Sequence, residues 1–598
     1  MTLRPSLDLA LIGNSSIAAL LDRRGSIVWM CWPRIDGDPV FCSLLDGDAS
    51  KGGFFSIELA EESEAGTEQS YVRNTAMVRT EVRAASGASF AITDFAPRFR
   101  HHGRMFKPPM IVRLIEPIEG MCRIRISCRP RLGYGEKIAA RFSGSNHVRY
   151  DLEHSAIRLT SDAPATYIVS ESGFVLSRPV TLILHSDETL ADSVGHVGQN
   201  FRAQTIFHWQ EWVRTLNVPL EWQEQVIRAA ITLQLCSFED TGAIVAALTT
   251  SIPEAPGSSR NWDYRYCWIR DAFHTVQALN RVGATATMER FIDYVTNVIA
   301  YERGPTLKPV YSIVPESPLE EVEAPFLSGF GGAGPVRVGN AARDQIQHDV
   351  FGSVILAASQ MFYDERLPSK GDKSLFLSLE PLGMSALSNA LTPDAGIWEY
   401  RGRLRVHTHS AAMCWVACDR LSRIAAKLEL SDRALQWRQS ADELKQTILS
   451  RAWNENLKCF AGSLDGEELD ASVLLLHEIG IVPAHDERFI STVDTIGRLL
   501  QRNGHVRRYS APDDFGVPSV AFIACTFWHV DALAAIGRVE EARTIFEDLL
   551  SHMNHVGLLS EDLDPMTGVL WGNFPQTYSM AGLIVAATRL SKQWGSVE

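Results

Sequence analysis

One glutamate lies in a loop that is dense in aromatic side chains. Glu399 stands between Trp398 and Tyr400. An apolar surrounding raises the pKa of a carboxyl group, so this position favours a carboxyl that keeps its proton near neutral pH. The indole of Trp398 also offers a flat face on which a sugar ring can stack. The alternative is an ordinary ion pair between Glu399 and Arg401 or Arg403 on a solvated loop.

A second glutamate lies in an acidic loop near the C-terminal end of the chain. Glu561, Asp562 and Asp564 fall within four positions. Three like charges would repel one another in an apolar pocket, so the cluster predicts a polar, partly hydrated setting in which Glu561 stays ionised. The alternative is a cluster at a helix start or a turn, where Ser560 or Asp564 acts as the cap.

A protonated and an ionised carboxyl group can act together as general acid and general base. Hydrolysis of a glycosidic bond with inversion needs such a pair. The acid protonates the leaving oxygen, and the base activates a water that fits between carboxyl groups about 6.5–9.5 Å apart. Their surroundings must differ, because one group has to keep its proton while the other loses it. The sequence therefore predicts this chemistry, with Glu399 as the acid and Glu561 as the base.

The segment Asn261–Asp271 carries the residue types that bind sugars. Four of its eleven residues are aromatic, and Trp and Tyr rings offer flat apolar faces. Arg and Asp side chains add paired hydrogen bonds to neighbouring hydroxyl groups. We therefore expect Tyr264, Trp268, Arg270 and Asp271 to bind substrate. The alternative for the last two is an ion pair at the start of a helix.

Composition limits the partners and cofactors. The formal net charge of −14 and the lack of a Lys/Arg cluster exclude nucleic acid or anionic lipid as the main partner. The ten cysteines form no CxxC pair and the histidines no HExxH pattern, so we expect no metal and no cofactor. No secretory signal and no bilayer-length apolar stretch is visible, so we expect a cytoplasmic protein without a membrane partner. The sequence leaves open whether the protein forms a homo-oligomer.

The elements that must position these residues fall into two regions. Residues 1–200 contain short segments of alternating polarity, separated by Gly, Asp, Asn and Pro, which predicts a large antiparallel β-sandwich. Its expected strands include Ser26–Trp29, Gly53–Leu59, Thr80–Ala84, Met110–Ile115, Arg123–Cys128 and Val180–His185. We place a helical linker at residues 201–222.

Helical periodicity dominates from there on, so residues 223–598 are expected to form a catalytic domain. The clearest helix starts at Ser431, a candidate N-cap, and continues with apolar residues three and four positions apart. The other expected helices are Glu224–Leu235, Asp271–Arg281, Ala286–Ala300, Ala341–Phe362, Ser410–Leu428, Asp486–Arg502, Ser519–Ile536, Glu540–Leu550 and Tyr578–Leu590. Helices joined by alternating short and long connections predict a toroid of helix hairpins, whose long loops gather on one face and build the site. These loops are Asn261–Arg270, Tyr311–Asn340, Pro393–Arg405, Arg507–Pro518 and Leu558–Gln576.

Several motifs, in the same order along nearly the whole chain, resemble those of glycoside hydrolase family 15. This family includes glucoamylases, glucodextranases and bacterial trehalases. The motifs are Ala10–Asn14, Gly25–Trp29, Pro33–Asp36, Trp268–Asp271, Pro335–Asn340, Gly396–Glu399, Arg507–Tyr509, Ser560–Pro565 and Gly572–Gln576.

The resemblance implies an N-terminal β-sandwich followed by an (α/α)6 barrel. It implies an exo-acting, inverting hydrolase that releases β-glucose from an α-glucoside. By motif, the general acid falls on Glu399 and the general base on Glu561. The residues that hold the attacking water or grip the sugar fall on Tyr264, Arg270, Asp271 and Arg508.

The predicted substrate is a small α-glucoside. A cytoplasmic chain with no starch-binding appendage favours trehalose first, followed by isomaltose or malto-oligosaccharides. The leaving-group subsite decides among them, and Ala411, Trp571 and Met580 depart from the family pattern expected near it. One other hypothesis is a disaccharide phosphorylase on a similar scaffold, against which a base at Glu561 argues. Another is an inactive sugar-binding protein, which the retention of both carboxyl groups disfavours.

Overall fold

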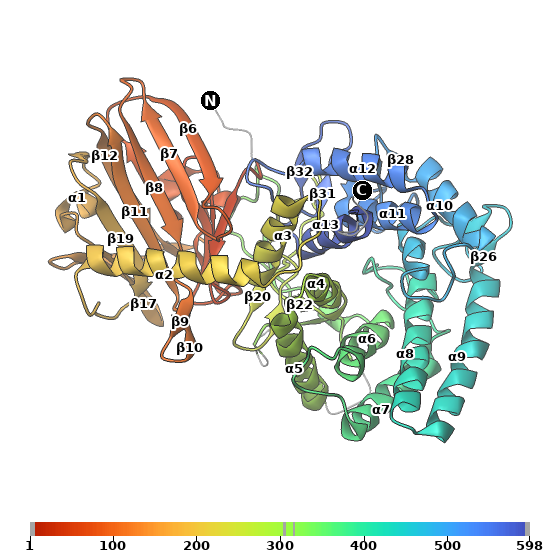
Figure 1. Cartoon of the computed structure of the whole chain (residues 1–598). Helices are drawn as coiled ribbons and strands as arrows, with labels where there is room; N and C mark the ends of the chain where they lie inside the picture. The colour runs from red at the N-terminus through yellow and green to blue at the C-terminus, as the bar shows by residue number, and fades with distance from the viewer. Residues whose placement is uncertain (1–5, 303–306, 315–316, 318, 593–598) are drawn as a thin grey trace.

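The computed structural model describes residues 6–302, 307–314, 317 and 319–592. Within them, a layered β domain lies beside a ring of helices (Figure 1). The first five and last six residues of the predicted domains lie outside the described residues. So do three residues, at 315, 316 and 318, of the predicted loop Tyr311–Asn340.

Two antiparallel sheets form the β domain. The first contains β1 (Ala10–Gly13), β2 (Ala18–Leu21), β3 (Ile27–Trp32), β4 (Asp38–Phe41), β5 (Phe54–Leu59), β12 (Arg123–Arg129) and β18 (Phe174–Val175). The second runs in the order β15 (Ala140–Ser143), β16 (His147–Leu152), β17 (Ser155–Ser161), β19 (Val180–Ser186), β11 (Met110–Glu119), β8 (Ser89–Phe95), β7 (Val78–Ala84) and β6 (Glu64–Tyr71). All six predicted segments coincide with strands, so the predicted antiparallel domain is confirmed.

A buried ion pair ties the two sheets together. Arg113 of β11 and Asp94 of β8 are both 0% exposed, and the guanidinium Nε donates to the Asp94 carboxylate at 2.7 Å. The same guanidinium donates to the carbonyl of Phe55, on β5 in the facing sheet, at 2.7 Å. It also lies 4.6 Å from the centre of the Phe55 ring. The charge is therefore fully paired inside an otherwise apolar core.

Helix α2 (Val194–Arg214) leads out of the β domain. It packs against β19 and runs towards the helical ring (Figure 1). The predicted boundary at residue 200 thus falls inside a helix, which begins before the predicted linker. The first half of α2 belongs to the core of the β domain, because Val194 and Val197 share one buried cluster with Val112 and Leu114 of β11 and Ile183 of β19.

The helices of the C-terminal part form a closed double ring. In the described chain, the inner ring contains α4 (Ile269–Arg281), α6 (Asp349–Tyr363), α8 (Thr408–Lys427), the short 3-10 helix η4 (Ala471–Leu476), α11 (Ile523–Ala535) and α13 (Thr577–Leu590). Each packs on the next, and α13 packs back on α4. The outer ring contains α3 (Gln223–Leu235), α5 (Thr285–Glu302), α7 (Lys373–Asn389), α9 (Ser431–Ala452), α10 (Glu487–Leu499) and α12 (Val539–Ser551). The predicted (α/α)6 barrel is confirmed, with one inner position filled by a 3-10 helix.

The predicted helix Ala341–Phe362 is wrong in its first half. A 3-10 turn, Ala341–Asp344, ends before α6 begins at Asp349. The side chain of Asn340 caps this turn by accepting the amide of Ala342 at 2.9 Å. The amide of His348 donates to the carboxylate of Asp394 at 2.8 Å. The local cap at Asn340 and the tertiary bond from His348 to Asp394 together separate the 3-10 turn from α6.

Two other helix predictions need correction. Ser431 is the first residue of α9, whose N-cap is Leu430, and no side chain caps this helix. Helix α7 was not predicted, because it contains Pro381 and proline normally ends a helix.

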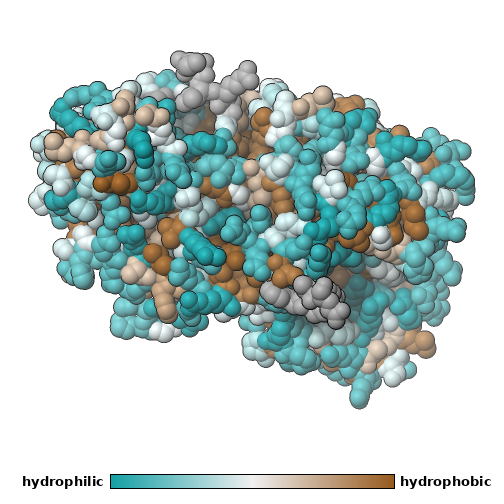
Figure 2. Space-filling model, turned by 45° about the horizontal axis from the view of Figure 1, so that its top comes forward, coloured by the Kyte–Doolittle hydropathy of each residue, from teal (hydrophilic) through white to brown (hydrophobic). Residues whose placement is uncertain are grey.

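The two parts of the chain are joined by polar contacts as well as by α2. Trp29 of β3 donates from its indole to the carbonyl of Leu248 at 2.8 Å, and the amide of Gly329 donates to the carbonyl of Leu45 at 2.8 Å. The face seen in Figure 2 is mainly hydrophilic, with hydrophobic side chains in separate groups. In the part of the chain that the structure describes, no helix is both long and apolar enough to cross a membrane.

Candidate active site

A pocket lies where the inner helices of the barrel begin. Its walls come from the starts of α4 and α13 and from the loops that precede α6, α8 and α11. The predicted long loops therefore do gather on one face. All eight predicted site residues line this pocket: Tyr264, Trp268, Arg270, Asp271, Trp398, Glu399, Arg508 and Glu561.

Three groups hold the carboxyl group of Glu399, and all three approach the same oxygen. The indole of Trp268 donates to Oε1 at 2.6 Å and the amide of Gln347 at 3.2 Å. The guanidinium of Arg270 lies 3.6 Å from Oε1. The side chain is 23% exposed, so the group is anchored on one side and open to the pocket on the other.

The backbone at Glu399 is also unusual. Its φ of +60° lies in the left-handed region, which costs a non-glycine residue about 1–3 kcal/mol and often marks a functional position. The predicted alternative for Glu399 is wrong, since Arg401 pairs with Glu321 at 2.7 Å and Arg403 with Glu468 at 3.0 Å.

Arg270 joins the sugar-binding candidates to Glu399. It donates to Asp271 at 3.2 Å, to Gln347 at 3.0 Å and to Asp349 at 3.1 Å. Burial raises the pKa of Asp271 to about 6, against the lowering effect of Arg270. The predicted ion pair between the two residues therefore exists, and both still face the pocket.

Glu561 lies in a buried setting, which overturns the predicted hydrated one. It is 2% exposed, and the hydroxyl of Tyr264 donates to its Oε1 at 2.6 Å. The next residues form β31 (Asp562–Leu563), which pairs with β30 (Ala521–Phe522) and β32 (Leu570–Trp571). This small sheet brings Gly572 over Glu561 so closely that a Cβ there would lie 2.6 Å from the Glu561 Cβ. Long-range strand pairing therefore excludes the solvent.

Burial changes the acidity of Glu561. Desolvation raises its pKa, the neighbouring Glu254 raises it further, and Arg508 and the Tyr264 hydroxyl oppose the rise. Carboxylate oxygens of Glu254, Glu561 and Asp562 lie within 4.8 Å of one another. Three such oxygens could hold a cation, but here arginine supplies the positive charge. Arg508 binds Glu254 and lies 3.9 Å from Asp562.

Trp398 is fixed among aromatic rings on the wall of the pocket. Its indole donates to Asp470 at 2.8 Å. The rings of Tyr509, Phe522 and Trp528 lie 5.6 to 5.9 Å from it, centre to centre. An immobilised indole loses little entropy when a sugar stacks on it.

Charged contacts close the rim. Arg260 donates to Asp513 at 2.7 Å, and Asp514 accepts the amide of Arg401 at 2.7 Å. The Arg401 guanidinium lies 4.3 Å from the ring centre of Trp262. The loop that carries both aspartates is thereby tied across the opening.

Comparison with known proteins places this barrel and pocket in a family. The profile described as "Glycosyl hydrolases family 15" matches residues 222–588, and one described as "Trehalase-like, N-terminal" matches residues 5–171. The chain belongs to glycosyl hydrolases family 15. It is therefore a glycoside hydrolase.

Relatives and solved structures agree with membership of family 15. A trehalase from Thermoplasma volcanium is 29% identical over 587 residues, which cover 97% of this chain and 93% of the relative. A trehalase from Mycobacterium tuberculosis is 31% identical over 625 residues, with coverages of 98% and 89%. A bacterial glucoamylase complexed with acarbose superposes with a TM-score of 0.70 at 14% identity and covers 98% of this chain and 94% of that chain. This last likeness shows the fold.

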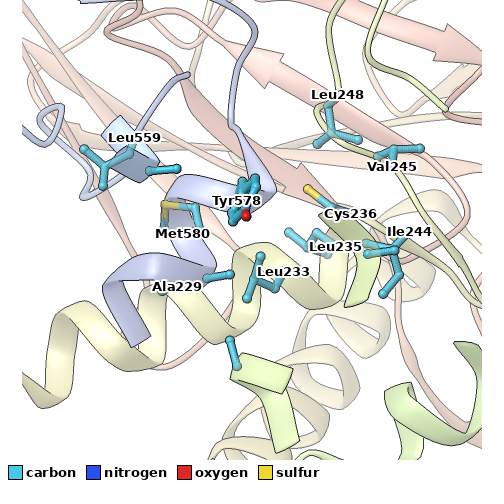
Figure 3. Packing of buried hydrophobic residues seen from close by; sticks show 14 of the residues in the cluster. Ala229, Leu233, Leu235, Cys236, Ile244, Val245, Leu248, Leu559, Tyr578 and Met580 are labelled. Carbon is cyan, nitrogen blue, oxygen red and sulfur yellow. The ribbon is translucent and has the colours of Figure 1, made fainter. Parts of the chain in front are cut away.

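The three departures from the family 15 pattern lie outside the pocket lining. Ala411 is buried in α8 and Met580 in α13, where Met580 lies beside Ala229 of α3 (Figure 3). Trp571 packs edge to face on Phe330, with ring centres 6.1 Å apart. The effect of the three residues on the leaving-group subsite stays a prediction.

Two polar residues of this family 15 site were not found from the sequence. Gln347 lay inside the wrongly predicted helix. Gln345 and Gln347 lie two positions apart just before Asp349. This period-two spacing could have indicated an extended segment. Glu254 is a single acid after Pro253 without a patterned neighbour, and no sequence signal marks it.

Proposed function

We propose that this family 15 enzyme hydrolyses trehalose with inversion, using Glu399 as general acid and Glu561 as general base. The observation that carries the proposal is that both carboxyl groups line one pocket and are held by neighbouring rings of one segment. Tyr264 holds Glu561 and Trp268 holds Glu399, each at 2.6 Å. The two rings lie 5.4 Å apart, centre to centre.

The contacts of Glu399 suit a proton donor. All three of its polar contacts reach Oε1. Within the described residues, no donor contacts Oε2, so this oxygen is free to carry the proton towards the glycosidic oxygen. Protonation of that oxygen lets the second glucose leave as its bond to the anomeric carbon breaks.

The contacts of Glu561 suit a general base whose ionisation depends on pH. The Tyr264 hydroxyl and Arg508 favour its ionised form, whereas burial and Glu254 oppose ionisation. Ionised Glu561 takes a proton from water, and the oxygen of that water forms the new bond to the anomeric carbon from the opposite face. The products are β-glucose and the released glucose, and solvent restores both carboxyl groups.

The rim favours a disaccharide over a long chain. The bonds from Arg260 to Asp513 and from Arg401 to Asp514 hold a loop across the opening. Two sugars fit behind such a rim more readily than a polymer. The curated relatives named trehalase support the same choice.

The substrate test is glucose release from trehalose, isomaltose, maltose and dextrin, without phosphate and with it. We expect hydrolysis of trehalose to be fastest and independent of phosphate, and polarimetry to show one β-glucose and one α-glucose per trehalose before mutarotation, because the leaving glucose keeps its own configuration. Faster release from dextrin, or a need for phosphate, would contradict the proposal.

Variants test the two carboxyl roles. Glu399→Gln and Glu561→Gln should each lower kcat by about 10²–10⁴-fold, the usual contribution of a general acid or base. Glu468→Gln is the matched control, because Glu468 pairs with Arg403 and Arg405 outside the pocket lining. Near-normal turnover in either active-site variant would refute its role.

A further inference from the structure

Two histidines and an aspartate meet at the end of α12, outside the active-site pocket. Asp548 and His552 lie four positions apart on this helix, so their side chains share a face. His505 reaches them from β29 (His505–Val506), the second strand of a hairpin with β28 (Gln501–Arg502). One ligand atom from each of the three lies within 4.8 Å of the others.

The spacing of the ligand atoms fits a metal better than a plain ion pair. Nε2 of His505 lies 3.4 Å from Oδ2 of Asp548, longer than a charge-assisted hydrogen bond of about 2.7–2.9 Å. In a tetrahedral zinc site with bonds of about 2.0–2.2 Å, neighbouring ligand atoms lie about 3.3–3.6 Å apart. A ring nitrogen of His552 lies within 4.8 Å of the ligand atoms of His505 and Asp548, and the two imidazole ring centres lie 5.1 Å apart.

The surroundings leave the ligands available. His505 is 2% exposed and presents its Nε2 to Asp548, while its other ring nitrogen, Nδ1, has no hydrogen-bond partner among the described residues. Asp548 is 49% exposed, which leaves solvent access for an open coordination position.

The backbone around the cluster is shaped for close approach. A Cβ at Gly504 would lie 3.2 Å from the Asp548 carboxylate, and a Cβ at Gly568 would lie 2.6 Å from the ring of His552. Both glycines have a positive φ, of 86° and 71°. Side chains at these positions would crowd the ligands from both sides.

We propose that His505, Asp548 and His552 bind one zinc-class transition metal ion. Two imidazoles and a carboxylate with an open fourth position form a ligand set that such ions favour. The ion would fasten the β28–β29 hairpin to α12. Because Arg508 lies two residues after the end of β29, the ion would also fasten the segment that carries Arg508 into the pocket. The sequence did not show this set because His505 lies far along the chain from the other two.

The test is zinc binding by the full-length, reduced protein after dialysis against a chelator. We expect one tight zinc ion per chain by titration calorimetry and a higher Tm with zinc, because a ligand that binds only the folded state stabilises it. Cobalt substitution should give the visible absorption of a tetrahedral site. The ten cysteines are buried and free. They are the same in all variants, so any zinc that they bind is the same in each and does not affect the comparison.

Asp548→Asn and His552→Gln should each weaken zinc binding at least tenfold and abolish the cobalt spectrum. The matched control is His196→Gln, because His196 and Asp192 have the same four-residue spacing, 3.6 Å apart, without a second histidine in any described cluster. Absence of a one-to-one zinc ion would overturn the proposal. So would binding that Asp548→Asn and His552→Gln leave unchanged.

Discussion

Replacing Glu254 with glutamine should move the pH dependence of catalysis to lower pH. Glu254 raises the pKa of Glu561, and the proposed base must be ionised before it can activate water. The rate constant kcat/KM therefore rises as pH passes through the pKa of Glu561 in the free enzyme. The rising part of the pH profile is its acid limb. Glu254→Gln removes one negative charge beside the proposed base, so the acid limb should shift to lower pH.

The size of the effect follows from the distance. A charge within 4.8 Å of Glu561 contributes about 3.5 kcal/mol at an effective dielectric constant of about 20, or about 2.5 in pKa. Arg508 binds Glu254 and cancels part of this field. We therefore expect the pKa that governs the acid limb to fall by about 1 to 2.

The assay is the initial rate of glucose release from trehalose, measured at low substrate concentration across the acid limb. Asp513→Asn is the matched control. Asp513 also pairs with an arginine of the pocket, Arg260, but it is not among the groups that shift the pKa of Glu561. An acid limb that stays in place or moves upward in Glu254→Gln would refute the reasoning, as would an equal shift in the control.

Three further substitutions test other parts of the structure. Tyr264→Phe removes the hydroxyl that donates to Glu561 and should lower kcat about 10- to 100-fold with little change in KM; equal kinetics would contradict its role. Asp94→Ala leaves the buried Arg113 without its partner and should cost about 3–5 kcal/mol in urea unfolding. A loss below about 1 kcal/mol would contradict it. Asp514→Ala removes the carboxylate that accepts the backbone amides of Arg401 and Gly402, so it loosens the rim and should raise the rate on dextrin relative to trehalose about tenfold; an unchanged ratio would show that the rim does not select substrate length.

The regular parts of the fold were predictable because they depend on local periodicity. The alternation along Thr80–Ala84 predicted β7, and the three- and four-residue steps after Ser431 predicted α9. Errors arose where tertiary contacts override local preference. The carboxylate of Asp394 holds the amide of His348 and keeps the preceding residues out of α6. No local pattern contains that contact.

The same distinction separates what could and could not be predicted about the site. The residue types around Glu399 and in Asn261–Asp271 indicated sugar chemistry, and these residues do line one pocket. The predicted environment of Glu561 was wrong, because the prediction considered only the charges within the acidic loop itself. The sheet that brings Gly572 over Glu561 depends on strands β30 and β32, which local sequence does not pair.

The β domain has a part in the chemistry even though the pocket lies in the barrel. Arg265 follows Tyr264 directly and is fully buried, with a bidentate bond to Asp263 at 2.7 and 2.9 Å. Its guanidinium also donates to the carbonyl of Gly37 at 2.7 Å and to the hydroxyl of Tyr134 at 3.0 Å, both in the β domain. These bonds fix the backbone from which Tyr264 reaches Glu561. A barrel separated from its β domain would lose the contacts of Arg265 with Gly37 and Tyr134, so the domain serves to position the proposed base.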